Sequence, residues 1–214
     1  MEMTWVERDG VYRAPLLEQF AWVDHGFGGR NAANWPPEHH AAVVQVHGDR
    51  VVTAASPGPQ GEGDALTTFT AGLYLSVRTA DCLPLLMVDA RQRRVAAVHA
   101  GWRGTIAGIP VAAIRAMESD PAQVWVAIGP GIGPCCFEVG EEVAREFGFQ
   151  GRQCVDLFAY NRKNLIDFGV PPGQIAGDGP CTRCWPEKFH SFRRDKAAAG
   201  RMHAAIAIRA GAIR

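Results

Sequence analysis

The sequence has no excess of charge of either sign and no long apolar run. Its 22 Lys and Arg residues balance 22 Asp and Glu residues, which leaves no global field to attract nucleic acid or an anionic membrane surface. No stretch approaches the roughly 20 apolar residues of a membrane-spanning helix, and residues 1–9 lack the apolar core of a signal peptide. We therefore expect no nucleic-acid partner, no membrane association and a cytoplasmic location.

Internal repeats and low-complexity tracts are also absent from the sequence. With 214 residues and 47% hydrophobic content, the chain can bury one substantial core without disulfides. We expect residues 1–214 to form a single domain with reduced cysteines. Cys181 and Cys184 form an isolated Cys-x-x-Cys motif, which is a weak signal for a metal or redox site, and the adjacent Cys135 and Cys136 are not expected to bond to each other.

The pattern of apolar residues predicts alternating strands and helices. Helix 105–117 should begin with Thr105 as its N-cap, and the Pro- and Gly-rich residues 56–63 should form a surface loop. Several connections are too short for helical crossovers, so we expect an α/β fold with a mixed sheet. The expected strands are 72–77, 83–88, 95–98, 124–128 and 202–208. The other expected helices are 139–147 and 160–168.

Three candidate metal ligands, His47, Cys82 and His99, lie at the ends of expected elements. Two imidazoles and one thiolate suit zinc, and they leave a fourth position for a water molecule. These ligand types are also compatible with copper, but a multicopper oxidase needs many histidines and a cysteine closely flanked by them, and the seven histidines here include no His-x-His pair. The alternative is that His99 is a core histidine and Cys82 a small buried apolar residue.

Several segments, in the same order, resemble the YfiH-like family. This family has also been called laccase-domain or polyphenol oxidase proteins, purine nucleoside phosphorylases and peptidoglycan editing factor. The resemblance begins at about Asp24 and continues to the C-terminus. It is carried by residues 76–86 with Ala-Asp-Cys, 95–105 with His-Ala-Gly-Trp-Arg-Gly, 127–140, 189–195 and the pair Gly200-Arg201.

The resemblance implies a mixed α/β sandwich, of the type also described as putative cysteine hydrolases. It also implies a catalytic zinc bound by His47, Cys82 and His99. Members of the family resemble enzymes that split adenosine, inosine and methylthioadenosine with phosphate and that also deaminate adenosine. We therefore expect a zinc-dependent purine nucleoside phosphorylase and adenosine deaminase, with a purine nucleoside and phosphate as its small-molecule partners.

The chain departs from the family pattern at two places. Gly131 stands where the family usually has the first cysteine of Gly-Pro-Cys-Ile-Gly-Pro-Cys-Cys, so that thiol cannot be essential here. The region between Gly29 and Gln45 is shorter than in other members. Any substrate contact that the family makes from that region is therefore in doubt.

Acid–base and phosphate-binding residues can be proposed beside the ligands. Asp81 or Asp64 could carry a proton during deamination, although Asp81 could equally orient a metal-bound histidine. Arg103, in a Gly-rich turn before an expected helix, is the best candidate for phosphate. Arg193 with Arg194 forms a second basic cluster, which could bind substrate or form part of a solvated surface loop.

Other functions remain open on the sequence alone. One is a hydrolase in which Cys82 attacks as a thiolate with His99 as its base. Another is a peptidoglycan-editing, amidase-like hydrolase that removes serine from a UDP-muramoyl precursor, as a bacterial relative is linked to doing. A third is an interaction protein without catalysis. The sequence also leaves the oligomeric state and the role of Cys181 and Cys184 open.

Overall fold

Two mixed β-sheets pack face to face in the computed structural model, which describes residues 5–177 and 179–211. The seven-stranded sheet has the order β1 (Val6–Arg8), β2 (Val11–Arg13), β3 (Val23–Gly28), β15 (Met202–Ile208), β8 (Tyr74–Thr79), β4 (His40–Val44) and β6 (Gly58–Glu62). The six-stranded sheet has the order β14 (Ile175–Ala176), β11 (Val124–Ile128), β9 (Leu83–Asp89), β10 (Arg94–Ala100), β7 (Ala65–Thr68) and β5 (Val51–Thr53). The expected mixed α/β sandwich is confirmed.

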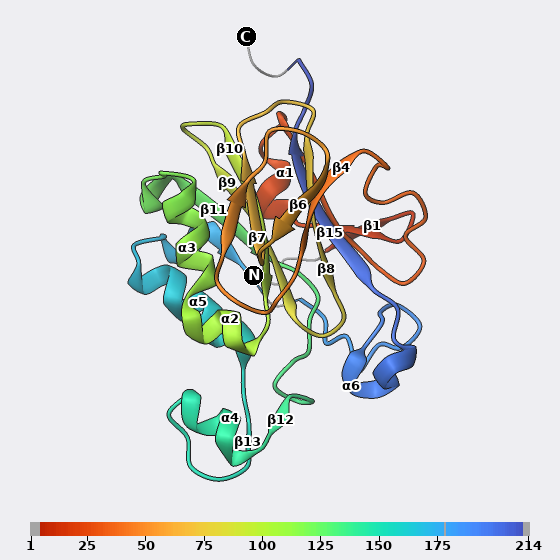
Figure 1. The fold of residues 1–214 in the computed structure, drawn as a ribbon, viewed down its shortest axis with the longest axis vertical. Helices are drawn as coiled ribbons and strands as arrows, with labels where there is room; N and C mark the ends of the chain where they lie inside the picture. Colours follow the sequence, from red (N-terminus) through yellow and green to blue (C-terminus); the bar gives the residue numbers. More distant parts are fainter. Residues whose placement is uncertain (1–4, 178, 212–214) are drawn as a thin grey trace.

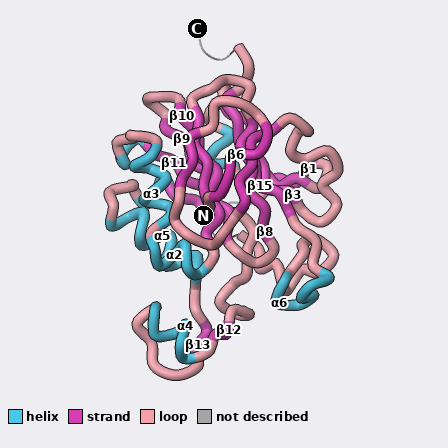
Figure 2. The backbone as a smooth tube through the Cα atoms, in the orientation of Figure 1, coloured by secondary structure: helices cyan, strands magenta, loops and turns pink. Residues whose placement is uncertain are grey.

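Helices cover the outer face of the six-stranded sheet, with α2, α3 and α5 on the side away from β15 (Figure 1). A small excursion with α4 and the two-stranded β12–β13 sheet extends from one end of the molecule, and α6 lies beside the end of β15 (Figure 2). The helices are α1 (Pro15–Glu18), α2 (Trp102–Ala107), α3 (Ile109–Ala116), α4 (Glu141–Glu146), α5 (Leu157–Asp167) and α6 (Phe192–Asp195). The short strands are β12 (Glu138–Val139) and β13 (Gln153–Cys154), and 3-10 turns span Pro121–Gln123, Pro172–Gln174 and Lys196–Ala198.

Burial on both faces explains the apolar sequences of the central strands. Along β9, Leu85 and Met87 face the helix-side core, whereas Leu86 and Val88 face the core between the sheets. A strand that is covered on both sides reads as a continuous apolar run, because successive side chains alternate between its two faces. Strands β8, β9, β10, β11 and β15 therefore lie within a few residues of their expected positions.

Three expectations about local structure are wrong. Thr105 is not an N-cap: α2 begins at Trp102 after Gly101, and Gly108, with φ 77°, separates α2 from α3. The Thr105 hydroxyl instead accepts a hydrogen bond from the Asn161 amide at 2.9 Å.

The other two differences concern the loop expected at residues 56–63 and the starting residues of two helices. Residues 58–62, expected in a loop, form the edge strand β6, where Pro59 is tolerated because one side of an edge strand makes no ladder hydrogen bonds. Helix α4 starts only at Glu141, because Val139 pairs with Gln153 in a short ladder. Helix α5 starts earlier than expected, at Leu157, where the Asp156 carboxylate accepts the Ala159 N–H at 3.0 Å.

The chain crosses between the two sheets several times, and two of these crossovers, the loops that precede β5 and β9, carry candidate ligands. The first crossover runs from β4 to β5 and carries His47, and the second runs from β8 to β9 and carries Cys82. His99 is the penultimate residue of β10 and lies opposite Pro84 of β9. Both crossovers and the end of β10 therefore meet at one end of the sandwich. Among the described residues, no helix is both long and apolar enough to cross a membrane.

Candidate metal centre and its pocket

The fold brings His47, Cys82 and His99 together. Their ligand atoms all lie within 4.8 Å of one another, and the two imidazole rings meet edge to face with centroids 4.9 Å apart. His47 is exposed, Cys82 half-buried and His99 buried. The three side chains thus form a group that can hold a metal ion and that faces outward on one side.

A fully buried carboxylate, Asp64, organises the histidine loop. Its two oxygens accept the backbone N–H groups of Val46, His47 and Gly48 at 3.2, 2.9 and 2.7 Å. His47 has a φ of 62°, in the left-handed region that a residue with a side chain seldom adopts. The hydrogen bonds to Asp64 hold the loop in this conformation and so fix the position of the His47 ring.

Asp64 also orients the second histidine. The Nδ1 atom of His99 lies 2.8 Å from Oδ1 of Asp64, and both side chains are buried. When Nδ1 donates its proton to the carboxylate, Nε2 is left with a free lone pair for a metal. This carboxylate–histidine pairing is the usual support of a metal-bound histidine. The sequence had considered Asp81 for this role, and the structure places Asp64 there.

The protonation of Cys82 is linked to that of His99. Burial raises the pKa of the Cys82 thiol, but the neighbouring His47 and His99 outweigh burial and lower that pKa to about 6. Burial lowers the pKa of His99, whereas hydrogen bonds to Asp64 and Cys82 raise it, to about 9. Cys82 is therefore held as a thiolate near neutral pH, which is the form that binds metals and acts as a nucleophile.

Glycine is required beside the three ligands. A Cβ atom added to Gly101 would lie 3.1 Å from Sγ of Cys82 and 3.3 Å from Cδ2 of His47. Because Gly101 precedes α2 directly, the chain passes close to the ligand atoms at this point. The first glycine of the Gly-Trp-Arg-Gly segment therefore allows the backbone to pack closely against the candidate ligands Cys82 and His47.

The ligands line a pocket of about 700 Å³. Three arginines, Arg78, Arg193 and Arg201, contribute to its walls, as do the aromatic rings of Phe137 and Phe192. Phe192 is 50% exposed, which is unusual for so large an apolar side chain. The pocket therefore combines three candidate metal ligands with positively charged and aromatic side chains.

Asp81 lies in the pocket wall, but its carboxylate is engaged. Its oxygens accept the Thr182 hydroxyl at 2.7 Å and the Arg193 backbone N–H at 2.5 Å. Asp81 itself has a φ of 87°, which shapes the turn that presents Cys82. These bonds tie the Cys82 turn to the 182–193 segment across the pocket.

The structure does not bring Arg103 to this pocket. Its guanidinium lies 4.4 Å from the centroid of the Trp102 ring and lines a separate hollow with Glu142 and Glu146. Arg193 does line the metal pocket, where its guanidinium donates to the carbonyls of Cys136 and Glu138. Arg194 instead pairs with Asp195 at 2.8 Å.

Sequence reasoning missed two of the pocket's cations and its aromatic residues. Arg78 lies on β8 next to the Cys82 turn, and Arg201 immediately precedes β15. Arg201 stands in a segment that carried the family resemblance, which was a signal for its importance. Phe137 and Phe192 also stand in segments that carried the resemblance, but an aromatic residue in a loop reads equally well as packing.

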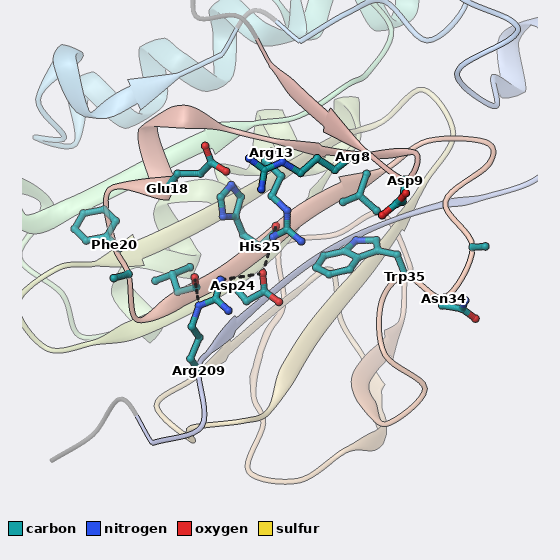
Figure 3. Close-up of a pocket in the computed structure, with 14 residues that line it drawn as sticks. Arg8, Asp9, Arg13, Glu18, Phe20, Asp24, His25, Asn34, Trp35 and Arg209 are labelled. Carbon is teal, nitrogen blue, oxygen red and sulfur yellow. Dashed lines mark hydrogen bonds and ion pairs between the residues drawn. The ribbon is translucent and has the colours of Figure 1, made fainter.

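A second pocket, of about 530 Å³, lies beside β2 and β3 (Figure 3). Its charges neutralise one another: Asp24 accepts a hydrogen bond from Arg13 and pairs with Arg209 at 3.6 Å. The Tyr74 hydroxyl also donates to Asp24. This pocket lacks the metal-ligand group and contains paired charges, so it is the weaker candidate for catalysis.

Comparison with known proteins gives a consistent result. The family described as multi-copper polyphenol oxidoreductase laccase matches residues 29–209. A purine nucleoside phosphorylase of Deinococcus radiodurans is 38% identical over 191 residues, which cover 83% of this chain and 73% of that protein. The adenosine deaminase RL5 from an unknown prokaryote is 37% identical over 160 residues, covering 67% of this chain and 61% of that protein.

A solved structure has the same fold. The crystal structure of YlmD from Geobacillus stearothermophilus superimposes with a TM-score of 0.88 and 28% identity, covering 98% of this chain and 100% of that one. The described sandwich, with its two crossovers, is therefore shared with a known protein.

Proposed function

The chain belongs to the family described as multi-copper polyphenol oxidoreductase laccase, and from that premise we propose that it is a zinc-dependent enzyme of purine nucleosides. It splits adenosine, inosine and methylthioadenosine with phosphate and also deaminates adenosine. The observation that carries the proposal is the group His47, Cys82 and His99 at the base of a pocket that also holds three arginines. Relatives named purine nucleoside phosphorylase and adenosine deaminase support the substrate class.

Zinc fits the donor set better than copper does. Two nitrogen donors and one thiolate, with a carboxylate behind one histidine, are typical of catalytic zinc sites. Multicopper sites require many more histidines than this pocket contains among its described residues. When bound, zinc supplies an activated water or polarises an oxygen of the substrate. The free cysteines fit a reducing compartment, in line with the expected cytoplasmic location.

The arginines are placed to bind phosphate. Arg78 and Arg201 are exposed at the pocket wall, and Arg193 reaches it from the opposite segment. A guanidinium offers planar, paired N–H donors to phosphate oxygens, so these side chains can hold the dianion that attacks the nucleoside. They replace Arg103, which lies in another hollow, as the proposed phosphate-binding residues.

The aromatic rings and Asp81 complete the proposed site. Phe192 and Phe137 offer flat apolar surfaces against which a purine base can stack. Of the two carboxylates considered, Asp81 lines the pocket, whereas Asp64 is held behind His99. Asp81 is therefore the proposed proton carrier in deamination, and Asp64 is a positioning residue.

Incubation of metal-assayed protein with adenosine, with and without phosphate, tests the proposal. We expect inosine alone without phosphate, and adenine and hypoxanthine in addition when phosphate is present, as identified by chromatography. Cys82→Ala should reduce all of these products to background, because the metal group loses its thiolate. The control Cys154→Ala, at an exposed cysteine of β13, should retain full turnover. Full activity in Cys82→Ala would contradict the proposed site.

A second candidate is favoured by the same side chains. Cys82, His99 and Asp64 are arranged as a thiolate, a base and an orienting carboxylate, which is the pattern of thiol hydrolases. Metal analysis separates the two functions. Activity that survives complete removal of metal, but is lost on alkylation of Cys82, would favour the hydrolase.

A further inference from the structure

Four cysteines outside the pocket meet at one point. Cys135 and Cys136 follow β11, and Cys181 and Cys184 follow β14. Their sulfur atoms all lie within 4.8 Å of one another, and all four thiols are free. In sequence, they were an adjacent pair and an isolated Cys-x-x-Cys. The fold combines them, because β14 pairs with β11 and Gly131 bridges to Cys181.

The spacing of the sulfur atoms is close to that of a tetrahedral site. Sγ of Cys184 lies 3.4 Å from Sγ of Cys136 and 3.7 Å from Sγ of Cys135. Four thiolates around a zinc ion at about 2.3 Å stand about 3.8 Å from one another. Small side-chain movements would therefore bring all four sulfurs into coordination.

Hydrogen-bond donors and a cation lie beside these sulfurs, whereas the neighbouring thiols raise the pKa of Cys184 to about 12. The Gly133 N–H donates to Sγ of Cys181 at 3.3 Å. Burial raises the pKa of Cys181, but the backbone N–H groups of Gly133, Cys184 and Arg183 outweigh burial and lower it. The Arg183 side chain also contacts the Cys136 thiol, which places a positive charge beside the group. Amide donors and a neighbouring cation are what a cluster of negative sulfurs requires.

From this geometry we propose a second, structural metal site, in which Cys135, Cys136, Cys181 and Cys184 bind one zinc ion as four thiolates. An all-sulfur set of four donors is characteristic of closed structural zinc sites, which leave no position for substrate. The site is separate from the His47, Cys82 and His99 group and does not depend on the proposed enzymatic function.

The ion would fasten together two segments that form the wall of the catalytic pocket. Thr182 N–H donates to the Gly131 carbonyl at 2.9 Å, and the Thr182 hydroxyl donates to Asp81. On the other segment, the Cys136 carbonyl accepts from Arg193 at 3.2 Å, and Phe137 lies under the Arg193 guanidinium. A metal at the four sulfurs would hold these contacts in register, because both segments otherwise lack regular structure.

Metal content of protein purified under reducing conditions tests the proposal directly. We expect two zinc ions per chain in the wild type. Cys82→Ala should retain one, and the double variant Cys181→Ser with Cys184→Ser should also retain one. The matched control Cys154→Ser should keep both, since Cys154 belongs to neither group. A wild type with a single zinc that is lost in Cys82→Ala would overturn the proposal.

Cobalt and thiol labelling keep the test valid if the double variant does not fold. Cobalt bound to Cys82→Ala protein should show the intense visible and near-ultraviolet bands of a tetrahedral site with four thiolates. In wild-type protein, the four cysteines should resist alkylation until a strong chelator is added. Rapid alkylation of all four cysteines before the chelator is added would contradict a metal site. A disulfide between any two of them in protein purified under reducing conditions would also contradict it.

Failure of this proposal can be told apart from failure of the proposed function. Loss of nucleoside turnover with two zinc ions still bound would count against the enzyme assignment alone. Normal turnover with one zinc ion, bound at His47, Cys82 and His99, would count against the four-cysteine site alone.

Discussion

The two cysteine-containing groups differ in donors and in support. The group of His47, Cys82 and His99 has one sulfur, opens into a pocket of about 700 Å³ and is backed by buried Asp64. The group of Cys135, Cys136, Cys181 and Cys184 is all sulfur, lies nearer the surface and is supported by backbone N–H groups. A mixed set with three donors leaves one coordination position of a tetrahedral ion open for water or substrate, whereas four thiolates occupy all four positions. Under the two proposals, the first group serves catalysis and the second cross-links two segments of the chain.

Removal of the Asp64 carboxylate behind His99 should cause the largest difference in metal affinity between the two groups. Asp64→Asn keeps the size of the side chain but removes the charge that orients His99 and holds the His47 loop. We expect a loss of about 10- to 100-fold in metal affinity and turnover, typical of such supporting residues. Competition with a chromogenic chelator measures the affinity. Asp49→Asn, an exposed change in the same loop, is the control.

The four-cysteine group should be unaffected by that change, because none of its supports involves Asp64. Equal weakening of both metals in Asp64→Asn would show that the groups are not independent. Unchanged affinity at the mixed site would show that Asp64 does not hold His99 as a ligand.

A smaller effect is expected from crowding the mixed group. The Cβ of Gly101→Ala would stand 3.1 Å from Sγ of Cys82, so the thiolate must shift by a few tenths of an ångström. We expect weaker metal binding and turnover reduced about tenfold, because a small displacement of a ligand misplaces the reacting groups. Steady-state kinetics with adenosine measure it. The control is Gly173→Ala, where an added Cβ meets no atom within 4 Å. Turnover equal to that of the control would contradict the close packing at Gly101.

The buried imidazole of His25 differs from that of His99 in the direction of its pKa shift. His25 accepts the Ala14 N–H at 3.0 Å, and burial together with Arg13 lowers its pKa to about 4. As the pH falls from about 6.5, the unfolded chain binds a proton at this position before the folded protein does. Stability present above about pH 6.5 is therefore lost progressively towards about pH 4, by at most about 1.4 kcal/mol per pH unit for one such group.

We expect His25→Gln to flatten this dependence in part, since glutamine can accept the same hydrogen bond without gaining a proton. Urea unfolding at a series of pH values measures the slope. His39→Gln, at an exposed histidine, should keep the wild-type slope. Parallel slopes in wild-type and His25→Gln protein would show that His25 does not contribute to the acid sensitivity.

Part of the fold was predictable because burial leaves a strong pattern. The continuous apolar runs of β9 and β10 follow from their two covered faces, and they placed Cys82 just before the first strand and His99 at the end of the second. Strand β6 was not predictable in the same way. Its Gly and Pro residues read as a loop, and it exists because β4 offers a free edge for pairing.

The candidate site was predictable in its ligands but not in its supports. The family resemblance marked His47, Cys82 and His99, and the structure brings them together. The role of Asp64 depends on a contact between the start of β7 and β10, which no local pattern records. Arg103 was misleading for a similar reason: the direction of its side chain is set by stacking on Trp102 rather than by the glycines around it.

The absence of a cysteine at Gly131 also has a physical explanation. A Cβ at this position would lie 2.2 Å from Cδ2 of Leu83 and 3.1 Å from the Asp81 carbonyl. The Leu83 side chain therefore occupies the space that a larger residue would need. The side chain at this position contributes nothing to the four-cysteine group, although the Gly131 backbone bridges to Cys181.

The two crossovers that carry His47 and Cys82 would make the binding of the proposed metal part of folding. Each leaves the seven-stranded sheet and enters the six-stranded sheet, where His99 completes the group. An ion held there would connect the two sheets of the sandwich. The unfolded chain has no assembled site, so the ion would bind only the folded protein. The free energy of unfolding would then rise with free metal, by about 2.7 kcal/mol at one hundred times the dissociation constant. The melting temperature of this protein would thus report the metal supply around it.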